Sequence, residues 1–390
     1  MEEKIMLKFT MNAKELKTMI DKGTAAINKK ASLPALTRLY FQVKADGTVK
    51  TLGTDHEHYA EINSNNAWNT SPGVFGIDIE DLKIITKMSD NITLEDISIE
   101  SENKISVKCG KKVVTIPKYE NIDIFLPSMD DTEEHILTMN ESWLLETIIN
   151  LSTYTSDYEA NKLMQVLHFD TTHRRVEALD GYRIGMRKLG NQKIEKENKS
   201  VLLHRNCMPV FKKIMNKKSD AEVKMSQDKK YVKIEGNDFT YIIRKVDGEY
   251  FKVNQMLTDD ADYSFIVDKE NMLSVMKYDC DLVKDMKKPV ILHSEDGKLY
   301  TYLKTIRYEA FDNVETDENV MSNDLYIGFN PHYLADVFSM IDIDKPVCRG
   351  KNNKSPLFID GEEYSFLVLP VNIGDEVENM KECINRDRVA

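Results

Sequence analysis

The feature that most constrains how this chain can fold is a short pattern that occurs three times at a constant interval. Residues 9–16, 137–144 and 265–272 are similar, so equivalent positions such as Leu16 and Leu144 lie 128 residues apart. Each copy reads as a short strand, a polar helix-capping residue and the start of an amphipathic helix. The capping residues are Asn12, Asn140 and Asp268. Three copies in constant register predict three similar structural repeats.

A second amphipathic helix is predicted later in each repeat. Its apolar positions are Leu82, Ile85 and Met88, then Met208, Phe211 and Ile214, and finally Leu334, Val337 and Met340. A three-residue spacing is common to amphipathic helices in general and explains each triplet by itself. It does not explain why Leu82, Met208 and Leu334 follow one another at an interval of 126 residues. The constant interval therefore supports the triplication.

The rest of each repeat alternates apolar and polar residues in the manner of half-buried strands, for example in residues 105–109 and 299–303. Turn sequences such as residues 45–47 separate these segments. The pattern predicts an α+β fold of three tandem domains, each with two helices on antiparallel sheets. We expect these domains at residues 1–130, 131–258 and 259–373, followed by a charged C-terminal tail at residues 374–390.

The formal net charge of −12 argues against a protein that coats nucleic acid by bulk charge attraction. Basic residues nevertheless gather on some of the predicted helices, where they could contact phosphates without sequence preference. A solvated helix face explains these residues equally well. The candidates for a DNA-facing surface are Lys30, Lys87, Arg205, Lys212 and Lys213.

The five cysteines are scattered and never form a C-x-x-C pair, which favours reduced thiols in a cytoplasmic protein. No apolar run approaches the ~18 residues that span a bilayer. The N-terminus lacks the apolar segment of a secretory signal. We therefore expect a cytoplasmic protein without a membrane partner.

Catalytic motifs are missing from the sequence, including the glycine-rich phosphate-binding loops and G-x-S-x-G. His56 and His58 alternate along a predicted strand and could both bind a metal, but no third ligand accompanies them. Acidic clusters at residues 130–134 and 258–262 could suggest a metal-dependent nuclease. Both clusters lie at predicted domain junctions, where solvated linkers explain them. We expect a protein that is not an enzyme and needs no metal or cofactor.

Several segments carry a family resemblance. Residues 33–36 and 52–57 resemble L-P-I-L and T-G-T-D-x-E, and residues 178–185 resemble A-T-D-G-H-R-L-A. The most specific match is residues 327–337, which are similar to I-G-F-N-x-x-Y-L-x-D-V, and residues 366–371 resemble a terminal L-I-L-P-V. These motifs belong to the bacterial DNA polymerase III β subunits, the β sliding clamps. The matches keep the order and the three repeats of that family, so the chain resembles a divergent or phage-encoded member.

The resemblance implies a head-to-tail homodimer whose six domains close into a ring around duplex DNA, with helices lining the hole and sheets outside. Such a ring tethers the replicative DNA polymerase for processive synthesis at the replication fork and is placed on DNA by a clamp loader. By matched position, the subunit contact would be formed by Val114, Ile116, Leu282 and Val283.

The family also implies a pocket between the second and third domains that takes a short apolar peptide from the loader or from DNA polymerases. By matched position, it would be formed by Met164, Leu179, Gly181, Tyr182, Arg183, Ile184, Phe251, Met256, Asn330, Tyr333, Pro356, Leu367, Val368, Leu369 and Pro370. This mixture of aromatic, Met and Arg residues suits an interface, although most apolar residues are simply core. Tyr182 replaces the family's histidine and residues 250–253 depart from its F-P-D-Y, which leaves the preferred peptide open.

Two alternatives stay open at this point. A protein with the clamp fold could bind partners without closing a ring, and its mass in solution would show this. A metal-dependent nuclease could use the acidic clusters, and metal-stimulated cleavage of DNA would reveal it.

Overall fold

The computed structural model describes residues 7–99, 102–120, 125–158, 160–284, 288–322 and 324–389. The chain divides into two compact bodies, unit 1 (residues 1–148 and 191–246) and unit 2 (residues 149–190 and 247–390). The predicted second domain is divided between these units, because some of its strands extend a sheet of unit 1 and others extend the sheet of unit 2. The division into three domains stays a prediction.

Unit 1 contains two antiparallel sheets. The first has the order β5-β1-β7-β8-β9, formed by Trp68–Ser71, Lys8–Met11, Ile92–Ile99, Glu102–Cys109 and Lys112–Pro117. The second has the order β14-β10-β16-β17-β18-β4-β3-β2-β6, formed by Lys193–Ile194, Glu134–Asn140, Glu222–Gln227, Tyr231–Glu235, Phe239–Arg244, His58–Ser64, Val49–Thr54, Arg38–Val43 and Gly73–Asp78. Pairing of β18 with β4 joins strands from the predicted first and second domains.

The helices of unit 1 are α1 (Ala13–Gly23), α2 (Ile79–Ile85) and α4 (Cys207–Ile214), which follows β15 (Ser200–His204). The helix α3 (Glu141–Leu151) begins in unit 1 and ends in unit 2. Asn12 caps α1 as predicted, because its side-chain oxygen accepts a hydrogen bond from the backbone N–H of Lys14 at 3.0 Å. Leu16 and Phe211 are buried, which confirms the apolar faces predicted for α1 and α4.

One residue of the predicted second helices lies outside its helix. Met88 follows α2, which ends at Ile85. The backbone N–H of Thr86 still bonds the carbonyl of Leu82, and that of Met88 bonds the carbonyl of Ile85, three residues back, so a tighter turn follows the helix. The spacing of apolar residues therefore extended the prediction by one turn, which is the usual uncertainty at a helix end.

Unit 2 contains one large antiparallel sheet. Its strands follow the order β11-β12-β13-β26-β25-β24-β19-β22-β21-β20-β23 and are formed by Val166–Asp170, Arg175–Leu179, Arg183–Lys188, Tyr364–Val368, Leu357–Asp360, Val347–Gly350, Tyr263–Val267, Glu309–Val320, Lys298–Lys304, Val290–Glu295 and Ile327–Phe329. Pairing of β13 with β26 brings residues of the predicted second and third domains together.

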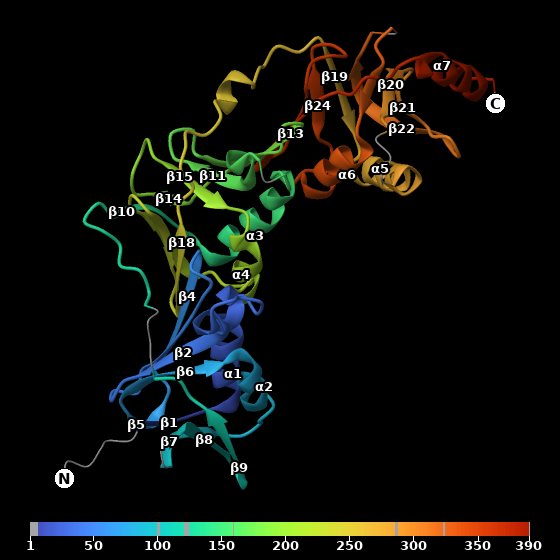
Figure 1. Ribbon diagram of the computed structural model, residues 1–390. Helices are drawn as coiled ribbons and strands as arrows, with labels where there is room; N and C mark the ends of the chain where they lie inside the picture. Colours follow the sequence, from blue (N-terminus) through green and yellow to red (C-terminus); the bar gives the residue numbers. More distant parts are fainter. Residues whose placement is uncertain are drawn as a thin grey trace. The chain divides into compact units, whose positions relative to one another are not determined.

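Two helices of unit 2, α5 (Lys269–Val283) and α6 (Pro331–Met340), lie side by side (Figure 1). Asp268 caps α5 as predicted and accepts a hydrogen bond from the backbone N–H of Asn271 at 2.9 Å. Leu334 and Val337 of α6 are buried, which confirms its apolar face. No helix in the described part of the chain is long and apolar enough to cross a membrane.

The segment predicted to be a charged tail forms a packed helix, α7 (Glu376–Asp387), beside β20 and β21 (Figure 1). Its buried residues Met380 and Ile384 pack on the aromatic rings of Tyr300 and Tyr302. The many charges of this segment obscured an apolar residue at every third or fourth position, which is the spacing of one helix face.

Candidate partner-binding site and basic surface

The predicted pocket segments lie next to each other in unit 2 because β13 and β26 pair in antiparallel register. Arg183 is opposite Val368 in this register, and Ile184 is opposite Leu367. The backbone N–H of Leu369 extends the contact by donating to the carbonyl of Tyr182 at 2.9 Å. Two segments far apart in sequence therefore form one continuous surface.

A tight turn before β13 presents Tyr182 to solvent. The side chain of Asp180 accepts hydrogen bonds from the backbone N–H groups of Tyr182 and Arg183, at 2.9 and 3.0 Å. Gly181 has a φ of 90°, which favours glycine at this position. Tyr182 is 61% exposed, and its ring stacks with that of Tyr333 at 6.3 Å between centroids. The turn thus offers an aromatic surface that is fixed in place.

Arg183 lies beneath this surface as a buried anchor. Its guanidinium donates to Asp180 at 2.9 Å, to Asp336 at 2.6 Å and to the backbone carbonyl of Thr153 at 2.8 Å. It also lies over the ring of Tyr333, 4.3 Å from the centroid. Burial by itself would lower the pKa of Arg183, but the hydrogen bond and charge of Asp336 raise it. Arg183 therefore holds the turn against α6 and is not a free binding group.

The other predicted pocket residues differ in their exposure. Leu179, Ile184, Leu367 and Val368 are buried, so they support the surface from below. Exposed or partly exposed are Met164, Gly181, Tyr182, Phe251, Met256, Asn330, Tyr333, Pro356, Leu369 and Pro370. Asn330 also caps α6 by accepting from the backbone N–H of His332 at 3.0 Å.

A cavity of about 450 Å³ in unit 2 includes two of the predicted residues, Leu369 and Pro370. Its other lining residues were not predicted from the sequence; they are Tyr326, Gly328, Asn353, Lys354, Val371, Asn372 and Ile373. Residues 371–373 directly follow the predicted segment, and that adjacency was the available signal. The candidate partner-binding site is the surface around Tyr182, Tyr333 and Leu369 together with this cavity.

The predicted basic residues all lie in unit 1. Lys212 and Lys213 occupy the last turn of α4, where cations also interact favourably with the helix dipole. Both side chains are exposed, as are those of Lys30 and Lys87. Arg205 is half-buried in the turn before α4. The helix α1 packs against α4, the helix that carries Lys212 and Lys213.

The predicted subunit contact differs from expectation in its details. Ile116 on β9 and Val283 on α5 are buried in the chain itself, so their side chains are core residues and not surface residues. Val114 and Leu282 are half-buried. The exposed apolar side chains on these elements are Val113, at 59%, and Tyr278, at 62%. Matching by position could not separate inward from outward residues, and the contact itself stays a prediction.

The histidines considered as metal ligands do not form a pair. His56 lies exposed in a left-handed turn with a φ of 76°. His58 is buried, where its Nδ1 lies 2.6 Å from the hydroxyl of Tyr241, and burial lowers its pKa. Within the described residues, one cluster of possible metal ligands occurs, His168, Asp170 and Glu177. Arg175 already donates to Glu177 at 2.6 Å, so this cluster has a cation of its own.

No protein-family model matches the chain. The chain is 21% identical over 395 residues to a β sliding clamp of Lactococcus lactis, covering 94% of this chain and 99% of that protein. It is 22% identical over 376 residues to a β sliding clamp of Pseudomonas aeruginosa, covering 94% of this chain and all of that protein.

Solved structures show the same fold. A DNA polymerase III β subunit from Eubacterium rectale superposes with a TM-score of 0.85 at 24% identity, over 94% of this chain and 99% of that one. A DNA polymerase sliding clamp from Bacillus subtilis superposes with a TM-score of 0.84 at 16% identity, over the same shares of the two chains. Both the predicted fold class and the predicted resemblance are therefore confirmed.

Proposed function

We propose that this chain, a divergent relative of the bacterial β sliding clamps, encircles duplex DNA as a homodimer and tethers a DNA polymerase for processive synthesis. The similarity to curated clamps over 94% of the chain is the observation that carries this proposal. In the proposed ring, each chain contributes three domains, and a clamp loader places the ring on DNA at the replication fork in the cytoplasm.

Two properties of the chain support a topological tether. The net charge of −12 disfavours tight binding to DNA from outside, whereas a ring needs only a weakly basic inner surface. Exposed lysines at the end of α4 and in the loops after α1 and α2 are suited to that inner surface. Their contacts with phosphates would carry no sequence preference, so the ring could slide.

We further infer that the surface around Tyr182, Tyr333 and Leu369 receives a short apolar peptide of a polymerase or loader. The exposed Tyr182 and Leu369 are supported by the buried Arg183 and by the paired strands β13 and β26. A preformed apolar surface with few polar groups is a typical peptide receiver, because little has to be ordered on binding. In this proposal the protein has no catalytic residues, cofactor or metal.

Topological linkage to DNA is the decisive test, and it can be made without the loader. A linear plasmid is ligated into a circle in the presence of the protein and then washed at high salt. We expect protein to stay with the closed circles and to be released when the circle is cut once. Salt removes electrostatically bound protein from both forms, so retention on circles alone identifies encirclement.

The alternatives predict different results. A clamp-fold protein that does not close a ring would sediment at the mass of one chain and would be washed from circular DNA. A nuclease would degrade DNA in the presence of Mg²⁺ or Mn²⁺. Either outcome would refute the ring proposal.

A further inference from the structure

The sheets of the two units contain an equivalent set of three paired residues on neighbouring strands. In unit 1, Tyr40 of β2 pairs with Leu52 of β3 on one side and with Gly76 of β6 on the other. In unit 2, Ile291 of β20 pairs with Tyr302 of β21 and with Gly328 of β23. The set Tyr40, Leu52 and Gly76 therefore corresponds to the set Ile291, Tyr302 and Gly328.

In the first and third repeats, the chain that follows the last strand pairs with this same glycine. Gly76 exchanges two backbone hydrogen bonds with Tyr119, at 2.8 and 2.9 Å. Gly328 accepts a hydrogen bond from the backbone N–H of Val371 at 2.8 Å. The interval from Gly76 to Gly328 and from Tyr119 to Val371 is 252 residues in both cases. The chain therefore continues from an equivalent point of the sheet in both units.

In unit 2 this continuation is α7, which covers one face of the sheet. Its residues Val377, Met380, Cys383 and Ile384 pack on Ile291, Tyr300, Tyr302 and Tyr326. Ion pairs hold its C-terminal end. Asp387 pairs with Lys298 at 3.1 Å, and Arg388 pairs with Glu295 and, at 3.4 Å, with Asp296. The sheet face is rich in aromatic side chains, and these are buried because a helix lies over them.

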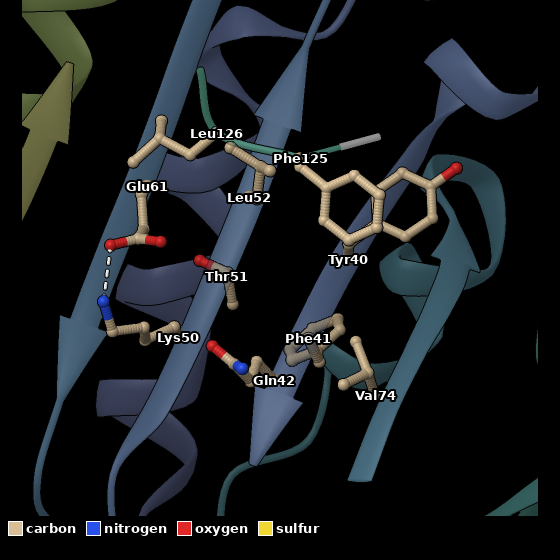
Figure 2. A pocket seen from close by; sticks show the side chains of 10 residues that line it. All are labelled: Tyr40, Phe41, Gln42, Lys50, Thr51, Leu52, Glu61, Val74, Phe125 and Leu126. Atoms are coloured by element: carbon tan, nitrogen blue, oxygen red, sulfur yellow. Dashed lines mark hydrogen bonds and ion pairs between the residues drawn. The ribbon is translucent and has the colours of Figure 1, made fainter. Parts of the chain in front are cut away.

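In unit 1 the corresponding face is only partly covered. Phe125 and Leu126 reach over it from the linker that leads to β10, and a cavity of about 140 Å³ lies beside them (Figure 2). Its walls are Tyr40, Phe41, Gln42, Lys50, Thr51, Leu52, Glu61, Val74, Phe125 and Leu126. An apolar cavity of about 150 Å³ accommodates a benzene ring, so this space suits one large apolar side chain.

The exposure of matched residues shows what the face in unit 1 lacks. Val74 precedes Tyr326 by the same interval of 252 residues, so the two positions correspond. Tyr326 is buried in the cluster beneath α7, whereas Val74 is 44% exposed. Phe125 reaches over the face from the linker, but its side chain is 72% exposed. Exposed apolar residues that adjoin a cavity are typical of interaction sites.

Tyr40 on this face is already buried, packed against Leu36. We propose that the remaining surface, formed by Leu52 and Val74 with Phe125 at its edge, docks an amphipathic helix of a partner protein. The equivalent face in unit 2 indicates the chemistry of the occupant, because α7 covers it with apolar residues at positions 377, 380 and 384. The ion pair of Lys50 and Glu61, 2.8 Å apart at the edge of the cavity, provides polar groups for the rim of the helix. This inference concerns unit 1 alone and does not depend on the proposed binding of DNA or polymerase.

The test uses the full-length protein and a synthetic peptide of residues 374–390 carrying Cys383→Ser as the probe. Methyl NMR of the protein should show shifts at Leu52, Val74 and Leu126 when the peptide is added. Val74→Glu and Phe125→Ala should each weaken the affinity at least 10-fold. Both side chains are exposed, so these variants should keep the melting temperature of the wild type. Trp68→Glu adds the same charge at another exposed apolar residue of unit 1 and should leave the affinity unchanged.

Three results would overturn the proposal. The first is unchanged affinity in the folded Val74→Glu variant. The second is a set of shifts at Ile291 and Ile384 in place of Leu52 and Val74, because the peptide would then be exchanging with α7. The third is a contact between the Phe125 ring and the Val74 methyl groups in the free protein that persists with peptide, because the linker would then fill the face by itself.

Discussion

Replacing Arg183 by alanine should loosen the candidate partner-binding site and destabilise unit 2. The side chain of Arg183 is 8% exposed, and it donates to three acceptors on three different segments of the chain. Alanine would leave Asp180, Asp336 and the carbonyl of Thr153 without this donor. The same change would remove the cation that lies over the ring of Tyr333.

The loss in free energy of unfolding depends on how well the three acceptors find other hydrogen-bond donors. Breaking a buried ion pair from one side typically costs about 3–5 kcal/mol. Asp180 keeps its two backbone N–H donors, and the side chain of Asp336 is 37% exposed, so water can replace the lost bond there. We therefore expect Arg183→Ala to lower the free energy of unfolding by about 3 kcal/mol, the lower limit of this range. In a cooperative unit of 150–250 residues this corresponds to a fall in melting temperature of roughly 6–12 °C.

Hydrogen exchange measured by mass spectrometry locates the effect, because it reports β13 and β26 separately from the strands of unit 1. Peptides that cover Arg183–Lys188 and Tyr364–Val368 should exchange faster in Arg183→Ala, whereas those from β7 and β8 should not change. Arg183→Lys should rescue little of the loss, because an ammonium group cannot form the same forked contacts.

Lys188→Ala is the matched control on the same strand. The side chain of Lys188 is exposed and donates to the carbonyl of Glu362 at 2.6 Å, so its removal should cost less than about 0.5 kcal/mol. If Arg183→Ala melts within 1 °C of the wild type, or if its β13 amides exchange at the same rate, the anchoring role assigned to Arg183 is wrong.

Further predictions concern three other side chains. Tyr182→Ala should leave the melting temperature unchanged but cost about 2 kcal/mol in affinity for polymerase peptides, roughly 30-fold in a fluorescence titration; wild-type affinity would exclude Tyr182 from the binding site. Burial, and then the charge of Asp312, raises the pKa of Asp279 to about 7. A raised carboxyl pKa means that stability is lost as the pH rises from about 4 to about 7. Asp279→Asn should therefore flatten the dependence of the melting temperature on pH and raise the melting temperature at pH 8. An unchanged dependence on pH would contradict the raised pKa of Asp279. Met380→Asp should release α7 from its aromatic face and increase the binding of a hydrophobic dye, since a buried charge is costly; no gain in dye binding would show that α7 does not cover that face in solution.

The sequence was most informative where structure depends on neighbouring residues. Asn12 and Asp268 cap helices at the positions predicted, because a cap and the first turn of a helix are decided within four residues. The repeat interval then placed equivalent helices in each third of the chain. The fold class followed from these local patterns.

The sequence was least informative where burial depends on distant segments. Ile116 and Val283 were assigned to a surface by matched position, but which side of an element faces the core depends on strands and helices elsewhere. The helix α7 was expected to be a tail because charges dominate its composition, whereas its packing depends on the aromatic residues of β21. The cavity beside Phe125 could not be predicted from the sequence, because it lies where the linker covers only part of the sheet face.

The pairing of β13 with β26 has a consequence for how the protein is made. Arg183 needs the backbone of Val368 as a partner, yet the two residues are separated by most of the second half of the chain. A ribosome that adds ~5–20 residues per second leaves this edge of β13 waiting for on the order of ten seconds or more. Unit 1 contains no residue beyond Val246, so all of its strands are synthesised before β26. During synthesis, β13 is therefore an open sheet edge, and a bound chaperone or a nearby nascent chain competes for it until the C-terminal strands emerge.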